Sequence, residues 1–282
     1  MKNVLQNINT ASFGQICKCR RNSWPRISVL LCGVLCVVAA GSFLVTNVSA
    51  DDKEAPPVIK AIAPLGIADG MTVQLSIRGF RLGDITGLKF PDLKTAPVFK
   101  IKSQGVAPAI NRASKDKIGD TQVDVELLLP VGTPAGDTTF IVVGPNGQSE
   151  PRKILVLDSR KAITEKEPND GFSDAQGFKL EQTIAGVLSG SSSRDVYGFS
   201  GESGQRVKIE VQAAQLGSLL EPLVLIHDAD GQLLMESAVG LGGYDPTLEI
   251  TLIKAGRYFI SIRDSKDAAS PMHAYLIRVR GQ

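Results

Sequence analysis

The chain has 282 residues and a formal net charge of +2, with four cysteines and one tryptophan. This length is enough for one or two domains with real hydrophobic cores. The small positive charge gives no support to nucleic acid as a partner, because it comes entirely from the first fifty residues.

The first fifty residues contain five basic residues, no Asp or Glu, and all four cysteines. Within them, residues 27–45 form an uncharged run, and Val48-Ser49-Ala50 then gives the small-residue pattern that signal peptidase reads. This order predicts an export signal, residues 1–50, that is cleaved after Ala50 and sends the protein to the periplasm, the cell surface or the extracellular space. The alternative is an uncleaved anchor helix at residues 27–45, since about 19 apolar residues can just cross a bilayer. Only in that case do we expect a membrane as a partner.

Without this leader the chain contains no cysteine. Its charge becomes about −3, because 31 basic residues less the five in the leader leave 26 against 29 acidic residues. The missing cysteines exclude disulfides, thiolate catalysis and cysteine metal sites. An exported protein without disulfides must be stabilised by its hydrophobic cores.

Beyond the leader, hydrophobic residues alternate with polar residues at a period of two. In residues 121–130 (TQVDVELLLP), Val123, Val125 and Leu127 face one way, and the polar side chains between them face the other. This pattern is typical of antiparallel strands with one buried and one solvated face. It recurs in residues 72–79, 207–212, 247–253, 257–263 and 275–280. We therefore predict an all-β fold.

Gly, Pro and Asp punctuate these strands. Residues 144–147 (GPNG) and 228–231 (DADG) lie between apolar runs and are predicted to be hairpin turns. Residues 102–120 are charged and irregular in pattern, so we expect a surface loop there. A short helix is expected at Ser173–Phe178.

The polar stretch at residues 158–168 is predicted to be a linker between two domains. The resulting organisation is a leader at residues 1–50, a first domain at residues 51–157 and a second domain at residues 169–282. Each domain contains enough alternating strands for a β-sandwich. The expected architecture is two tandem β-sandwiches after an N-terminal signal or anchor helix.

The first domain contains PPVIKAIAP (56–64), DGMTVQLSIRGFRL (69–82) and VELLLPVGTPAGDTTFIVVGPNGQS (125–149). This order is a proline-anchored first strand, a strand that ends in a glycine turn, and a final hairpin. It resembles an IPT/TIG domain. The resemblance implies an immunoglobulin-like β-sandwich.

The second domain contains EPNDGFSDAQ (167–176), RDVYGFSGESGQRVKIEV (194–211), GSLLEPLVLIHDADGQLL (217–234) and DPTLEITLIKAGRYFISIRD (245–264). These blocks and their spacing resemble a bacterial pre-peptidase C-terminal (PPC) domain over its whole length. The resemblance implies a compact β-sandwich or jelly roll. A leader followed by an IPT/TIG-like and a PPC-like module is similar to secreted proteins of planctomycete-type bacteria.

The PPC resemblance also implies a calcium site. Related domains of clostridial collagenases bind collagen and hold calcium where the linker meets the sandwich. Ca²⁺ takes roughly six to eight oxygen ligands, and a dication relieves the repulsion between crowded carboxylates. By this resemblance the ligand positions fall on Glu165, Glu167, Asn169, Asp170 and Asp195.

Two observations speak against that site. The family pattern G-D-x-D has a further Asp where this chain has Ser193, so one charged ligand is missing. The segment EPND (167–170) can also be read as a plain turn. Pro168 would then fix the backbone, and Asn169 or Asp170 would cap the next segment.

Other motifs favour structure over chemistry. The segment DADG (228–231) lacks the closing Glu of a calcium loop. His227 and His273 have no second His or Cys at ligand spacing, and we expect both to be ordinary strand or surface residues. Four aromatic residues are expected in the core and one, Tyr244, in an exposed loop. The core set is Tyr197, Phe199, Tyr258 and Tyr275.

No catalytic constellation appears in the sequence, and we expect the protein not to be an enzyme. The predicted function is a non-catalytic, exported binding or adhesion-type protein that recognises an extracellular or envelope polymer or protein, with calcium as a possible cofactor. The alternative is an accessory or chaperone-like component of a secreted protease system, because PPC modules commonly follow protease domains.

Overall fold

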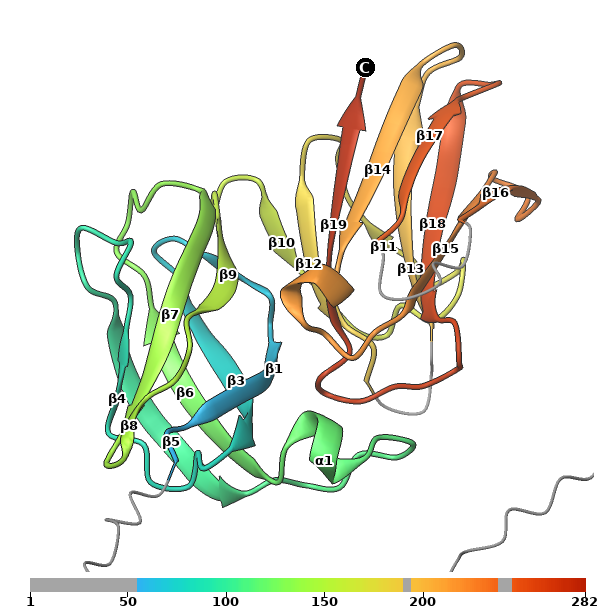
Figure 1. The fold of residues 1–282 in the computed structure, drawn as a ribbon. Helices are drawn as coiled ribbons and strands as arrows, with labels where there is room; N and C mark the ends of the chain where they lie inside the picture. The colour runs from blue at the N-terminus through green and yellow to red at the C-terminus, as the bar shows by residue number, and fades with distance from the viewer. Residues whose placement is uncertain (1–54, 190–193, 238–244) are drawn as a thin grey trace, which may run out of the picture. The chain divides into compact units, whose positions relative to one another are not determined.

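The computed structural model describes residues 55–189, 194–237 and 245–282, and these form two β-sandwiches (Figure 1). The predicted leader, Ser193 and Tyr244 lie outside the described residues. The all-β fold with two sandwiches is confirmed. In the described part of the chain, no helix has the length and apolar character that crossing a bilayer requires.

The first sandwich contains one four-stranded sheet and one five-stranded sheet. Its strand pairs are antiparallel apart from a parallel pair between the second and ninth strands. The first sheet has the order β1 (Val58–Ala63), β3 (Thr72–Phe80), β6 (Thr121–Leu128), β5 (Val98–Val106). The second has the order β2 (Gly66–Ala68), β9 (Arg152–Leu157), β7 (Gly136–Gly144), β4 (Gly87–Lys89), and β8 (Gly147–Gln148) pairs with β7.

The second sandwich contains two five-stranded sheets. Its pairs are antiparallel except for β10–β12 and β11–β13, which are parallel. One sheet has the order β10 (Ala162–Thr164), β12 (Thr183–Val187), β19 (Ala274–Gly281), β14 (Arg206–Gln212), β17 (Thr247–Thr251). The other has the order β11 (Gln176–Gly177), β13 (Arg194–Gly201), β18 (Gly256–Asp264), β15 (Pro222–His227), β16 (Leu233–Glu236).

Alternation explains how each sheet acquires a buried face. Along β6, Val123, Val125 and Leu127 are fully buried, and the residues between them lie on the outer face. There, Asp124 accepts hydrogen bonds from Ser76 on β3 (2.6 Å) and from a serine of β5 (2.7 Å). The outer face is thus held by polar cross-strand contacts, and the inner face by apolar burial.

Both predicted hairpin turns are confirmed. Gly144 pairs with Gly147 at the end of β7 and β8. In the DADG turn, the Asp228 carboxylate accepts hydrogen bonds from the backbone N–H groups of Asp230 (3.0 Å) and Gln232 (2.9 Å). This is the local side-chain bonding that makes Asp favourable in turns.

Three local predictions were wrong. The loop expected at residues 102–120 is shorter, because residues 102–106 belong to β5. The remainder is irregular except for the short helix α1 (Lys115–Ile118). Residues 162–164 of the expected linker form β10, which pairs with β12. The helix expected at Ser173–Phe178 is absent: a turn there leads into β11. All three strands lie at the edge of a sheet, where the sequence shows little alternation.

Arg78 on β3 holds the remaining loop between β5 and β6 in place. Its guanidinium is buried and donates to the carbonyl oxygens of Pro108 (2.6 Å) and Gly119 (3.2 Å). Burial lowers the pKa of Arg78, while Asp120 acts in the opposite direction. A buried guanidinium needs such acceptors, because it is expensive to desolvate. The only other described helix is the 3₁₀ turn Ala214–Leu216.

Gly79 marks the closest backbone approach in the first sandwich. It lies opposite Ile59, where the register between β1 and β3 shifts. A Cβ atom at Gly79 would lie only 1.8 Å from the carbonyl oxygen of Val58, which is backbone and cannot swing away. The two strands can pair here only if this residue has no side chain.

Gly79→Ala is therefore expected to lower the free energy of unfolding by about 3 kcal/mol, through forced separation of β1 from β3. Gly83→Ala is the matched control, because the nearest atom to its added Cβ would be 3.9 Å away. Urea denaturation followed by far-ultraviolet circular dichroism measures both. Equal stability of the two variants would contradict the close approach.

Candidate metal centre

Three of the predicted ligand side chains meet at one point in the second sandwich. Glu165 and Glu167 follow β10, and Asp195 is the second residue of β13. One carboxylate oxygen from each lies within 4.8 Å of the other two. Asp195 is 1% exposed, Glu165 is half-buried and Glu167 is exposed. Asp170 is not part of this group, and its carbonyl oxygen accepts a hydrogen bond from Arg194 Nε (3.2 Å).

Strand pairing positions Glu165. Its backbone N–H donates to the carbonyl oxygen of Ala185 on β12 (2.9 Å), which continues the β10–β12 pairing by one residue. Its Oε2 accepts a hydrogen bond from the backbone N–H of Val187 (2.8 Å). β12 thus holds Glu165 by its backbone and by its carboxylate before any ligand is considered.

Asn169 connects this segment to the sheet. It is fully buried, and its carbonyl oxygen accepts a hydrogen bond from Val196 N–H on β13 (2.7 Å). Its Nδ2 donates to Glu165 Oε1 (3.1 Å), and its N–H donates to Glu167 Oε2 (3.2 Å). The side-chain oxygen Oδ1 is buried and no described group donates to it. A buried acceptor without a partner costs about 1–3 kcal/mol, so this atom requires an explanation.

Two tyrosines lie beneath the carboxylates. The Tyr275 hydroxyl donates a short hydrogen bond to Asp195 Oδ2, and the hydroxyls of Tyr197 and Tyr275 are 2.6 Å apart. Each hydroxyl also lies 3.2 Å from Glu165 Oε1. Both tyrosines, with Phe199 and Tyr258, are buried as predicted, but their role at the site was missed. A signal was available, because residues two apart on a strand share a face, as Asp195 and Tyr197 do.

The electrostatics show an excess of negative charge. Burial, reinforced by the hydrogen bond and charge of Glu165, raises the pKa of Asp195 to about 9. Burial and then repulsion by Glu165 raise the pKa of Glu167. Burial and the neighbouring charges also hold the pKa values of both phenols well above their usual range. In the described part of the chain, no Lys, Arg or His forms a salt bridge with these three acids.

The donor set fits a hard cation. The available atoms are carboxylate and amide oxygens, which are the ligands of Ca²⁺ rather than of Zn²⁺. The unpaired Asn169 Oδ1 adds one more oxygen beside the carboxylates. A dication would neutralise charge that no described basic side chain balances. Glu165, Glu167, Asn169 and Asp195 are thus the residues that could hold Ca²⁺.

The two histidines lie elsewhere in the second sandwich. His227, on β15, makes an edge contact with Phe172, with ring centroids 5.0 Å apart. Burial, with a smaller contribution from Arg194, lowers its pKa. His273 is buried, and its Nδ1 lies 2.7 Å from the Ser270 hydroxyl. His227 is a strand residue, as predicted, but His273 is buried just before β19 and is neither a strand nor a surface residue.

No protein-family model and no curated protein matches the sequence. Among solved structures, the pre-peptidase C-terminal domain of the collagenase from Bacillus anthracis is 18% identical, with a TM-score of 0.30, and the match covers 41% of this chain and 100% of that domain. A mixed-linkage glucan utilisation protein of Bacteroides ovatus (SGBP-B), in complex with a heptasaccharide, is 9% identical, with a TM-score of 0.25 and coverage of 79% of this chain and 74% of that one. SGBP-B from a xyloglucan utilisation locus of Bacteroides uniformis is 10% identical, with a TM-score of 0.23 and coverage of 81% and 74%. These low TM-scores assign neither a family nor a function, so the PPC and IPT/TIG families stay predictions.

The raised pKa of Asp195 predicts an unusual pH dependence for the metal-free protein. The folded protein keeps this proton up to a pH of about 9, whereas the unfolded chain loses it near the ordinary value of 3.8. Between these limits the folded state binds more protons, so the free energy of unfolding falls as pH rises. Asp195→Asn cannot ionise, and it should reduce the loss of stability between pH 5 and pH 8 by about 2 kcal/mol.

Urea denaturation in EDTA at the two pH values measures this difference. Asp230→Asn is the control, because that residue is exposed in the DADG turn and should leave the pH dependence unchanged. The assignment fails if Asp195→Asn shows the same pH dependence as the unmodified chain.

Proposed function

We propose that this chain is a non-catalytic, exported protein that binds an extracellular or envelope polymer or protein, and that Ca²⁺ braces its second sandwich. The observation that carries the calcium proposal is the orphaned Oδ1 of buried Asn169, beside the carboxylates of Glu165, Glu167 and Asp195. A cation that both parts of the chain coordinate would link the segment after β10 to Asp195 on β13. It would thereby connect the start of the second sandwich to the middle of a sheet.

Burial of Asp195 supports a structural role over a catalytic one. A general acid or base must reach the reacting atoms of a substrate, but Asp195 is 1% exposed and Asn169 is fully buried. Three described pockets are lined by other residues. Paired acids alone therefore do not favour hydrolysis here. The alternative, an accessory or chaperone-like role in a secreted protease system, rests on the PPC resemblance alone.

Calorimetric titration of residues 51–282 with CaCl₂ tests the metal site. We expect saturable binding and a rise in melting temperature of about 5 °C or more in millimolar calcium, because a ligand that binds only the folded state stabilises it. Asp195→Asn and Glu165→Gln should abolish both effects.

Asp174→Asn is the matched control, since Asp174 is exposed and its carboxylate contacts only Ser173 among described side chains. This variant should bind calcium as the unmodified chain does. Absence of binding heat together with an unchanged melting temperature in millimolar calcium would remove the metal proposal.

A pull-down of residues 51–282 against collagen, chitin, cellulose and cell-envelope fractions tests the binding function. We expect retention by at least one of these materials, because a non-catalytic exported module acts by binding. In parallel, the chain should hydrolyse neither casein nor a glycan panel. Turnover that disappears when one acid is replaced would overturn the non-catalytic assignment.

A further inference from the structure

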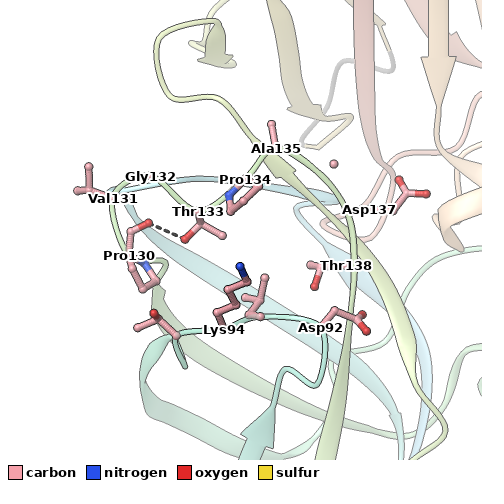
Figure 2. A pocket seen from close by; sticks show the side chains of 13 residues that line it. Asp92, Lys94, Pro130, Val131, Gly132, Thr133, Pro134, Ala135, Asp137 and Thr138 are labelled. Atoms are coloured by element: carbon pink, nitrogen blue, oxygen red, sulfur yellow. Dashed lines mark hydrogen bonds between the residues drawn. The ribbon is translucent and has the colours of Figure 1, made fainter.

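The first sandwich contains a pocket of about 450 Å³ at one end of its strands (Figure 2). Residues 92–95, between β4 and β5, form one wall. Residues 130–138, from the loop after β6 into the start of β7, form the rest. This volume lies within the range of roughly 300–1,000 Å³ that is usual for ligand pockets.

Hydrogen bonds fix both walls in place. Asp92 Oδ2 accepts from the backbone N–H (2.8 Å) and the hydroxyl (2.6 Å) of Thr139, which ties the 92–95 turn to β7. In the facing loop, the hydroxyl of Thr133 donates to the Pro130 carbonyl oxygen (2.6 Å). The N–H of Gly132 donates to Asp69 Oδ2 (2.8 Å). A pocket built this way is preformed, so a ligand does not have to order it.

Thr138, one of the residues that line the pocket, carries an unpartnered hydroxyl. Thr138 is only 4% exposed, and no described group forms a hydrogen bond with its Oγ1. Figure 2 shows Thr138 between Lys94 and Asp92. A buried hydroxyl without a partner is unfavourable, and a ligand atom that hydrogen-bonds to it would remove this penalty.

The walls combine apolar surface with polar side chains, among them a basic and an acidic residue without a described ionic partner. Pro130, Val131 and Pro134 supply apolar surface, and Val131 is 87% exposed. Lys94 forms no salt bridge within the described residues, and Asp92 Oδ1 has no described partner. An ammonium group donates to a carbonyl oxygen and a carboxylate accepts from an N–H, so the pair matches the two polar groups of a peptide unit.

Apolar surface also continues beyond the pocket. A Cβ atom on Gly70 would lie 2.8 Å from Val131 Cγ2, so Val131 packs against the turn that carries Met71. Met71 is 50% exposed. A chain that leaves the pocket on this side would therefore meet further apolar surface.

The residues that line the pocket include no aromatic ring. Sugar rings bind most readily by stacking on aromatic faces, so this lining favours a peptide over a glycan. We infer that the pocket binds an extended peptide segment with a small apolar side chain, presented by a protein partner. This inference rests on the proposed binding function and narrows its partner to a protein.

Methyl-detected NMR titration of residues 51–282 tests the inference with three probes: acetyl-Ala-Val-Ala-amide, acetyl-Gly-Gly-Gly-amide and cellotriose. The first should shift the methyl signals of Val131, Ala135 and Thr138 in a saturable manner at millimolar concentration. The triglycine peptide should bind about tenfold more weakly, because it lacks the apolar side chain. Cellotriose should shift none of these signals.

Two variants link the binding to the proposed contacts. Thr138→Val removes the hydroxyl at nearly constant shape, and it should weaken the binding of acetyl-Ala-Val-Ala-amide about tenfold while keeping or raising the melting temperature. Lys94→Met should weaken the same binding about threefold to tenfold. Lys254→Met is the matched control at an exposed turn of the second sandwich and should leave it unchanged.

Saturable shifts by cellotriose instead of the peptides would overturn the ligand class, and so would unchanged binding by Thr138→Val. Absence of any shift from the three probes would overturn the pocket as a binding site. If envelope material still retains the chain in that case, the proposed binding function stands and only the pocket is wrong. If no material retains the chain but the peptide binds, the proposed function fails and the pocket stands.

Discussion

Side chains that alternate between the two faces of a strand force a carboxylic acid into the interior of the second sandwich. On β13, Asp195 shares its face with Tyr197 and Phe199, and all three are buried. β13 is paired on both sides, with β11 and β18, so Asp195 cannot turn to the other face of the sheet without moving both aromatic rings out of their core positions. The register that builds the core therefore also creates a buried acid.

A buried acid must be neutralised or paired, and the surrounding groups only partly achieve this. Tyr275 donates to Asp195, while Val187 N–H and Asn169 Nδ2 donate to Glu165. No described group donates to Asn169 Oδ1. A proton on Asp195 removes one charge but leaves that oxygen unpaired. A divalent cation would satisfy the carboxylates and the amide oxygen together, and it would have to displace this proton in order to bind.

The alternating pattern of the sequence predicted the strands that have one buried and one exposed face. The prediction failed for strands whose two faces are similarly exposed or that are very short. Residues 121–128 alternate strongly because one face of their strand is buried in the core. Residues 257–263 keep an alternating pattern although both faces of β18 are largely buried. β5 is exposed on both faces along much of its length, so its second half reads as a loop. β10 and β11 have only three and two residues, which is too short for any periodicity. The resemblance to PPC domains indicated the acids, but the unpaired oxygen of Asn169 depends on packing that no spacing reveals.

A buried polar atom without a hydrogen-bond partner indicates a site only when its side chain has no second atom of the same type, donor or acceptor, that is already bonded. Arg78 Nε is also buried and unpartnered, but the same guanidinium donates to two carbonyl oxygens through its other nitrogens. Asn169 has only one side-chain acceptor, and Thr138 has only one polar side-chain atom, so neither has a substitute. Asn169 Oδ1 belongs to an amide whose Nδ2 donates to Glu165, so this oxygen lies near the acids and fits the proposed cation. Thr138 lines the pocket together with the 92–95 turn and the proline-rich loop, which fits the proposed neutral peptide ligand. The same physical test thus supports both the proposed metal site and the proposed peptide site.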